Sequence, residues 1–351
     1  MDLSIVIPCL NEKRTIKRAI AEAYKYLKKE KIKSFEIIVA DNGSNDGSQK
    51  EVLKSRVAKI VNVPVRGYGA ALHYGILKAK GKFVLFADAD LSYSFSEIKK
   101  FKTFLNQKVD LVLGSRIKGN IKKGAMPFLN RYLGTPVLTY LIRLIYKIKT
   151  TDTNSGMRMI RKSFYRKLKM KNSGMEWASE LLIKTSFNNG VYREVPINFA
   201  KDKRRRSPHL IPWADGWRHL KAIVLLKPNT LLVPIILFLT ISVTFLNSYT
   251  EFSRFSFLTM FALSLSFLAV KILHMAINNE KNFLVSVLQK TPIVMIAILT
   301  TIAWFIFLVT FPSSLGNFKS LISGVITIFD MWVFLIETIK THLINRLPDK
   351  L

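Results

Sequence analysis

The chain has 351 residues, a single cysteine and a formal charge of +31, which comes from 54 basic and 23 acidic residues. One cysteine excludes an internal disulfide and any zinc cage built from thiolates, and we interpret Cys9 as a small packing residue. Such a basic chain could bind nucleic acid, but it has no nucleic-acid-binding motif. Attraction of lysine and arginine to an anionic membrane face and to anionic substrates explains the excess more simply, so we expect no nucleic-acid partner.

Apolar runs and amphipathic patterns alternate through the first two thirds of the chain. The apolar runs predict strands at residues 3–8, 35–40, 58–63, 83–87 and 109–113. A helix with one apolar face, formed by Ile16, Ala19, Ile20, Ala23 and Leu27, follows the first strand. Helical patterns between strands favour an open α/β sheet, whose ligands bind beyond the carboxyl ends of the strands. No basic region precedes the first strand, so we expect no secretion signal and a cytoplasmic domain.

A pair of aspartates closes the apolar run that ends at Ala87. Asp88 and Asp90 cannot both stay buried and ionised without a cation. Two residues apart, they can share Mg²⁺ or Mn²⁺, which prefers oxygen ligands and keeps substrate phosphates as further ligands. Surface turns often produce Asp-x-Asp, so the tripeptide alone is a weak signal. Its place beside two other polar loops, 8–12 and 41–48, strengthens it, although the second loop alone could be an ordinary turn.

Three further segments carry polar or basic groups suited to phosphate. The sequence RGYGAA at 66–71 opens a predicted helix, where glycines allow close backbone approach and the helix N-terminus can face a phosphate. Arg116 and Arg131 could clasp a phosphate monoester, because guanidinium matches phosphate oxygens bidentately. Alternatively, Arg116 pairs locally and Arg131 is a solvated helix charge. The basic run at 201–206 is either a solvated strip facing lipid or a loop that closes over a diphosphate.

The last third of the chain is mostly apolar. Four stretches, 229–247, 255–277, 292–311 and 318–339, each approach the ~20 residues that cross a bilayer. Basic residues in the middle loop and the tail place both termini in the cytoplasm by the positive-inside rule. We therefore expect a cytoplasmic domain at 1–226 and an all-α membrane domain of four helices at 227–351. Mixed apolar and basic patterns at 126–147 and 208–226 predict helices at the membrane interface, with core packing as the alternative.

Several motifs occur in an order that resembles family 2 glycosyltransferases of the GT-A fold. They are IVIPCLNE at 5–12, VADNGS at 39–44, GYGAA at 67–71 and DADL at 88–91. The resemblance narrows to dolichyl- and polyprenyl-phosphate mannose and glucose synthases through GSR at 114–116, NR at 130–131, SGMR at 155–158 and GME at 174–176. It covers residues 1 to about 226 and implies a Rossmann-like nucleotide-diphospho-sugar transferase fold.

The resemblance also implies site residues. Nucleotide binding falls to Pro8, Leu10, Asn11, Glu12, Asp41, Gly69, Ala70, Asp88 and Ala89. Asp88 and Asp90 would bind Mg²⁺ or Mn²⁺, and Ser92 stands where the mannose type often has a glutamine ligand.

The remaining implied residues concern acceptor and donor phosphates. Arg116, Arg131 and Thr135 would contact the acceptor phosphate, and Arg204 or Arg206 the donor diphosphate. Catalytic roles fall to Asp90 and Asp152, the latter in a loop that matches the family near the reaction centre, with a turn-forming role as the alternative. Glu176 and Glu180 are further carboxylates that could orient the acceptor or a sugar hydroxyl.

These features predict a membrane-bound enzyme that transfers one hexose from a UDP- or GDP-sugar to undecaprenyl or dolichyl phosphate. The site would lie on the cytoplasmic leaflet of the inner membrane, or of the endoplasmic reticulum in a eukaryote, and the family implies metal dependence and inversion. One alternative is a processive polysaccharide synthase, whose Gln-x-x-Arg-Trp signature is absent here. The other is a lipid-carrier flippase or scaffold without enzymatic activity.

Overall fold

The computed structural model describes residues 1–204, 212–227 and 236. Contacts divide the chain into two units, and the first contains Met1–Ile223, which includes all the elements below except the end of the last helix. Apart from residue 236, the four stretches predicted to span a membrane lie outside the described residues. Within the described residues, no helix is both long enough and apolar enough to cross a bilayer.

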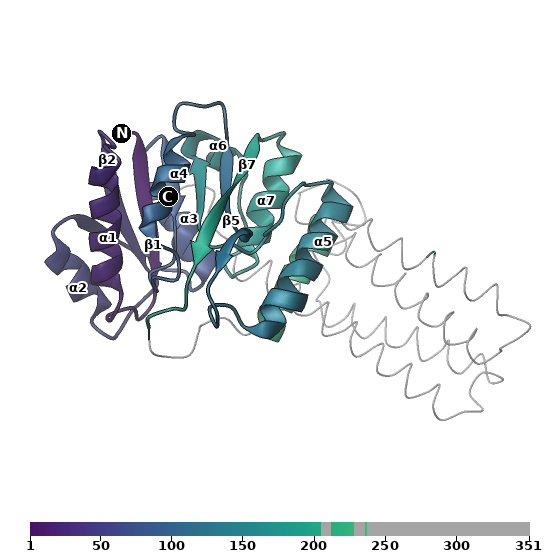
Figure 1. Cartoon of the computed structure of the whole chain (residues 1–351), viewed down its shortest axis with the longest axis horizontal. Helices are drawn as coiled ribbons and strands as arrows, with labels where there is room; N and C mark the ends of the chain where they lie inside the picture. The colour runs from purple at the N-terminus through teal and green to yellow at the C-terminus, as the bar shows by residue number, and fades with distance from the viewer. Residues whose placement is uncertain (205–211, 228–235, 237–351) are drawn as a thin grey trace, which may run out of the picture. The chain divides into compact units, whose positions relative to one another are not determined.

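A seven-stranded mixed sheet forms the centre of this unit, in the order β3-β2-β1-β4-β6-β5-β7 (Figure 1). The strands are β1 (Leu3–Cys9), β2 (Phe35–Asp41), β3 (Ala58–Asn62), β4 (Phe83–Phe86), β5 (Leu111–Ile121), β6 (Arg158–Arg161) and β7 (Tyr192–Phe199). Strands β1 to β4 pair in parallel, whereas β6 runs antiparallel to both of its neighbours, β4 and β5. The carboxyl ends of β1, β2 and β4 therefore share one edge of the sheet.

Helices cover both faces of the sheet. They are α1 (Ile16–Lys29), α2 (Ser48–Ser55), α3 (Tyr68–Lys78), α4 (Ile98–Lys102), α5 (Thr135–Tyr146), α6 (Lys162–Lys167), α7 (Trp177–Phe187) and α8 (Pro212–Leu226), with short turns η1 (Phe95–Glu97) and η2 (Asn130–Gly134). Ile5 and Ile7 of β1 join the apolar core under α1, while Val6 points to the opposite face, towards α3. A Cβ on Gly75 of α3 would lie 2.4 Å from a Val6 methyl, so glycine permits this close approach.

The expected α/β sheet is confirmed, and all five predicted strands are present. The fifth is longer than expected, because β5 continues past the sheet core to pair with the end of β7 at Asn120 and Ile121. Strands β6 and β7 were not predicted. The helix predicted within 126–147 is α5, and the one predicted within 208–226 is α8.

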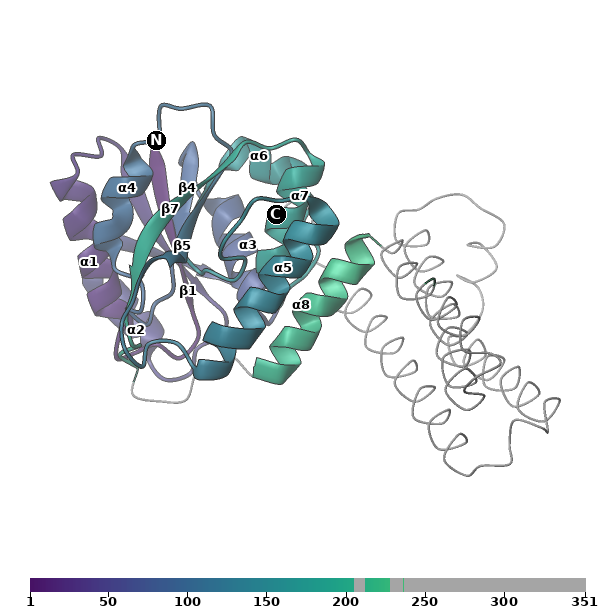
Figure 2. The ribbon, with the colours of Figure 1, turned by 45° about the vertical axis from the view of Figure 1, so that its right-hand side comes forward.

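Helix α8 is attached to the domain by two polar contacts with the helices beside it (Figure 2). The Tyr146 hydroxyl of α5 donates to the backbone carbonyl of Ile223. The Nδ1 atom of His219 lies 2.7 Å from the Ser179 hydroxyl of α7. Burial, and more weakly the nearby Arg158, lowers the pKa of His219 to about 4. His219 is therefore neutral in the folded domain near neutral pH.

This buried histidine predicts acid-sensitive stability. Between its ordinary pKa of 6.5 and about 4, the unfolded chain binds a proton that the folded chain does not. The free energy of unfolding should therefore fall as pH drops through this interval, by up to about 3 kcal/mol from this group. His219→Gln should flatten that dependence in urea unfolding of the full chain, followed by circular dichroism. An equal loss of stability with pH in both proteins would contradict the assignment.

Candidate active site

Two polar loops interlock beyond the ends of β1 and β2. The Ser44 hydroxyl accepts from the backbone N–H of Asn11 at 2.9 Å, and the Asn11 side chain accepts from the N–H of Asn45 at 2.9 Å. Parallel pairing of Cys9 with Asp41 places the loops side by side. The structure thus brings together the predicted residues of 8–12 and Asp41, which are far apart in sequence.

Asp41 has one satisfied oxygen and one open oxygen. Its Oδ2 accepts from the N–H groups of Gly43 and Ser44 and from the Gln49 side chain, at 3.3, 3.2 and 2.7 Å. Its Oδ1 is buried and has no hydrogen-bond partner among the described residues. An unpaired buried carboxylate oxygen is costly, so this atom suits a ligand that donates a hydrogen bond.

The glycine-rich turn before α3 packs against protein rather than leaving open space. A Cβ on Gly67 would lie 2.1 Å from the Ser173 carbonyl, and one on Gly69 would lie 2.5 Å from Trp177. The N–H of Ala70 donates to the Ser173 carbonyl at 2.9 Å. Close packing on the segment before α7 therefore accounts for the small residues, and the expected binding of a nucleotide by Gly69 and Ala70 stays a prediction.

Asp88 and Asp90 follow β4 at the same edge. The Tyr68 hydroxyl donates to Asp88 Oδ1 at 2.9 Å. Loss of hydration, and then the neighbouring charge of Asp90, raises the pKa of Asp88 to about 7. Burial first, and the repulsion between the two carboxylates second, disfavour the ionised form of Asp88, and a cation between the carboxylates would favour it.

The side chain of Ser92 orients the second carboxylate. Asp90 Oδ1 accepts from both the N–H and the hydroxyl of Ser92, at 2.9 and 2.6 Å. Asp90 Oδ2 instead faces the Arg204 guanidinium at 3.0 Å. The described residues hold no cluster of three or more histidine, cysteine, aspartate or glutamate side chains suited to a metal. A divalent ion on this pair would thus need ligands from substrate or water.

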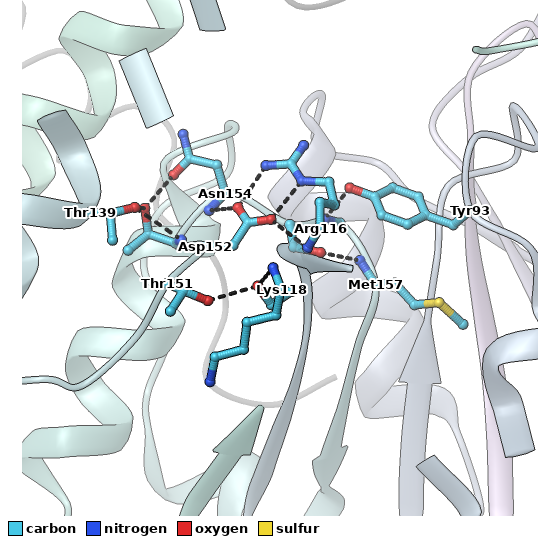
Figure 3. A network of polar contacts seen from close by, with 12 residues as sticks. Tyr93, Arg116, Lys118, Thr139, Thr151, Asp152, Asn154 and Met157 are labelled. Atoms are coloured by element: carbon cyan, nitrogen blue, oxygen red, sulfur yellow. Dashed lines mark hydrogen bonds and ion pairs between the residues drawn. The ribbon is translucent and has the colours of Figure 1, made fainter. Parts of the chain in front are cut away.

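Arg116 and Asp152 form a buried bidentate ion pair (Figure 3). The Arg116 Nε and Nη2 atoms lie 2.7 Å from the two carboxylate oxygens, and the Arg116 backbone N–H donates to Oδ2 at 3.0 Å. Asp152 is 0% exposed. Burial raises the pKa of Asp152, but the charge and hydrogen bonds of Arg116 outweigh it and hold the pKa below its usual range. Both carboxylate oxygens are engaged, so Asp152 holds the Arg116 side chain in place, and its expected catalytic role stays a prediction.

The other two expected acceptor residues lie at the start of α5. Arg131, in η2, is partly exposed, and its guanidinium lies over the Tyr132 ring at 5.4 Å. Thr135 is buried at 4% exposure. No carboxylate pairs with Arg131 in the part of the chain that the structure describes. Arg131 therefore has a cationic head available to an anion, whereas the Arg116 head is already paired.

A buried arginine that received no role from the sequence fixes the Asp152 loop. Arg158 is 0% exposed, and its guanidinium donates to the carbonyls of Thr153, Ser155 and Ala178 at 2.6, 2.9 and 2.7 Å. Arg158 belongs to the SGMR motif that supported the family resemblance, but the motif does not predict these contacts. Sequence reasoning also missed Tyr68, although it lies inside the glycine-rich turn. Arg206 lies outside the described residues.

An apolar strip is exposed along η2 and α5. It consists of Phe128, Tyr132, Leu133, Val137, Tyr140 and Leu144, each between 45% and 78% exposed. Leu138, Ile142 and Tyr146 on the other side of α5 are buried. Core packing therefore accounts for one face of the helix, while the apolar strip has no covering in the described part of the domain. Patches of this kind typically mark an interaction surface.

The mixed sheet with helices on both faces is a Rossmann-like α/β fold of the GT-A type. Residues 4–169 match the model of glycosyl transferase family 2, and the chain belongs to this family. The family resemblance seen in the sequence is thereby confirmed.

Curated relatives and one solved structure agree with this membership. A Haloferax volcanii protein, the low-salt glycan biosynthesis hexosyltransferase Agl6, is 30% identical over 65% of this chain and 54% of its own length, so the chain spans about half of that relative. The dolichyl-phosphate hexose transferase of the same organism is 29% identical over 64% of this chain and 92% of that protein. The glucosyl-3-phosphoglycerate synthase of Mycobacterium tuberculosis shares the fold, with a TM-score of 0.50 and 22% identity. The match covers 63% of this chain and 78% of that one, which was solved with Mn²⁺, UDP and glucosyl-3-phosphoglycerate.

The Arg116–Asp152 pair should be critical for stability. Asp152→Asn leaves a buried guanidinium without its counter-charge, which should cost about 3–5 kcal/mol. Thermal unfolding of the full chain would show this as a large drop in melting temperature. Glu51→Gln, which breaks the exposed pair with Lys54 at 2.7 Å, is the matched control and should change little. Equal melting temperatures for the parent and Asp152→Asn would refute the role.

Proposed function

We propose that this protein is a membrane-associated hexosyltransferase that moves one hexose from a nucleoside-diphosphate sugar to a polyprenyl phosphate. The observation that carries the proposal is the convergence of Asp41, Asp88 and Asp90 at one sheet edge in a family 2 domain. The Haloferax volcanii relative that this chain matches over 92% of its length is named a dolichyl-phosphate hexose transferase. The human relative, 34% identical over 115 residues, is named a dolichyl-phosphate beta-glucosyltransferase.

The nucleotide would bind across the two interlocked loops. The open Asp41 Oδ1 can accept a hydrogen bond from a base N–H or a ribose hydroxyl, and Asn11 and Glu12 line the neighbouring loop. Both UDP- and GDP-hexoses carry such donors, so the loops suit either. The diphosphate would then extend towards Asp88 and Asp90 at the end of β4.

Asp88 and Asp90 are the residues that would hold Mg²⁺ or Mn²⁺. Their crowded charges, and an Asp90 oxygen that already faces a cationic group, fit a hard cation with oxygen ligands. Such an ion, when bound, would neutralise charge on the departing nucleotide diphosphate. Tyr68 and Ser92 fix the two carboxylates through hydrogen bonds, so they are held ready in the ligand-free protein.

The acceptor would approach from the side of α5. A phosphate monoester is largely dianionic at neutral pH, with a second pKa near ~6, so it needs cationic groups more than a general base. Arg131 provides an available guanidinium next to Tyr132 of the apolar strip. We place this strip at the lipid headgroups of the cytoplasmic leaflet, where the polyprenyl chain is buried and its phosphate is exposed. The apolar stretches at 229–339 would anchor the chain as four helices, with both termini in the cytoplasm.

Asp90→Asn tests the reaction. The variant should lose at least about 100-fold in transfer from a panel of UDP- and GDP-hexoses to a short polyprenyl phosphate, because it weakens the cation site. Asp110→Asn, at the start of β5 on the opposite edge, is the matched control and should retain activity. Mass spectrometry of the lipid product distinguishes one transferred hexose from a polymer. Near-normal turnover by Asp90→Asn would rule out the proposed site.

Charge placed on the apolar strip tests the membrane-facing role. Tyr140→Glu with Leu144→Glu should raise the KM for a long polyprenyl phosphate in liposomes by about tenfold or more, because charged groups resist burial among lipid. The kcat with a short, water-soluble prenyl phosphate should stay unchanged. Leu53→Glu, on an equally exposed leucine of α2, is the control. An unchanged KM for the long acceptor would argue that α5 does not meet lipid.

A further inference from the structure

The chain after β7 returns to the acidic edge and docks there through its backbone. The N–H of Ala200 donates to the Ser92 carbonyl at 2.9 Å, and the N–H of Lys203 donates to the Asp90 carbonyl at 3.0 Å. Phe199 forms an isolated β-bridge with Tyr93. The segment 199–204 is therefore held against the Asp88–Asp90 loop rather than passing near it by chance.

This docking puts one guanidinium among three carboxylates. Arg204 lies 3.0 Å from Asp90 Oδ2, 3.4 Å from Glu12 Oε1 and 3.8 Å from Asp202 Oδ1. Its side chain is 13% exposed, and those of Glu12 and Asp90 are 6% and 7% exposed. Charges this sheltered from water interact strongly, so the ion pair belongs to the site and not to the solvated surface.

Asp90 has a single oxygen left for a cation. Its Oδ1 already accepts two hydrogen bonds from Ser92. A carboxylate oxygen has two lone pairs, so these donors saturate it. The remaining atom, Oδ2, is the one that Arg204 faces. A metal ion and the Arg204 guanidinium must therefore compete for the same oxygen.

We infer that Arg204 is a built-in counter-ion of the acidic edge, which a divalent cation displaces from Asp90. The inference rests on the proposed metal role of Asp90. Displacement costs the guanidinium its nearest carboxylate, Asp90, unless a new anion replaces it, and a nucleotide diphosphate is such an anion. Metal and nucleotide should therefore strengthen each other's binding by the same factor. Arg204 would offset the charge of Asp90 while no donor is bound and make the edge selective for metal and nucleotide together.

Manganese binding to the full chain, without and with UDP or GDP, tests this exchange. Arg204→Gln should bind Mn²⁺ about tenfold more tightly than the parent without nucleotide, as followed by electron paramagnetic resonance of free Mn²⁺. The gain in Mn²⁺ affinity on adding nucleotide should shrink correspondingly in this variant. Arg204→Lys, which keeps a cation, should bind Mn²⁺ more weakly than Arg204→Gln.

The matched control is Lys203→Gln. It removes the same charge from the adjacent exposed residue and keeps the backbone bond to Asp90, so Mn²⁺ affinity should not change. Equal or weaker Mn²⁺ binding by Arg204→Gln without nucleotide would overturn the exchange while leaving the metal site intact. An equal gain in Lys203→Gln would overturn it too, because general charge would then explain the effect. Absence of Mn²⁺ binding in every protein, even with nucleotide, would instead refute the proposed metal role itself.

Discussion

Negative charge concentrated at one edge of a buried parallel sheet is the constraint on which this domain depends. Two strand ends, those of β2 and β4, bring Asp41, Asp88 and Asp90 to that edge, where water is partly excluded. Each carboxylate is satisfied on one oxygen by local donors and left open or cation-paired on another. The folded protein thus satisfies one oxygen of each carboxylate by hydrogen bonds and leaves the other oxygen available to ligands. The edge is prepared before any ligand arrives, which lowers the reorganisation that binding requires.

A second charge pair organises the opposite side of the site. Arg116 and Asp152 satisfy each other, and the loop around Asp152 is held by buried Arg158 and by Glu194, which accepts from Thr150 and Thr151. The hydroxyls of Thr139 on α5 and Thr153 in this loop lie 3.2 Å apart. The helix that carries the apolar strip is therefore attached directly to the loop that fixes Arg116. A displacement of α5 would therefore act on this loop.

The sequence predicted the parts of the fold that local pattern determines. Strands β1 to β5 are apolar runs, and Asp-x-Asp at a strand end marked the acidic edge. Strand β6 was missed because RMIR has charged ends and four residues, and β7 because Pro196 interrupts a polar, alternating edge strand. Contacts between residues that are distant in the chain could not be predicted from the sequence either. No local pattern shows that Gly69 packs on Trp177, or that Asp152 is saturated by Arg116.

The unpredicted strands and contacts have a common physical origin. The two sides of the site are built in different ways. The acidic edge is built from strands that are parallel neighbours in the sheet. Their carboxyl ends meet there, so its residues lie in short motifs at the strand ends. The side that carries Arg116 is built by β5, β6 and α5, which meet through antiparallel pairing, the Arg116–Asp152 ion pair and the contact between Thr139 and Thr153. Changes there need not disturb the acidic edge. The two sides could therefore vary independently, and the apolar strip on α5, which the described part of the domain leaves exposed, lies on the second side.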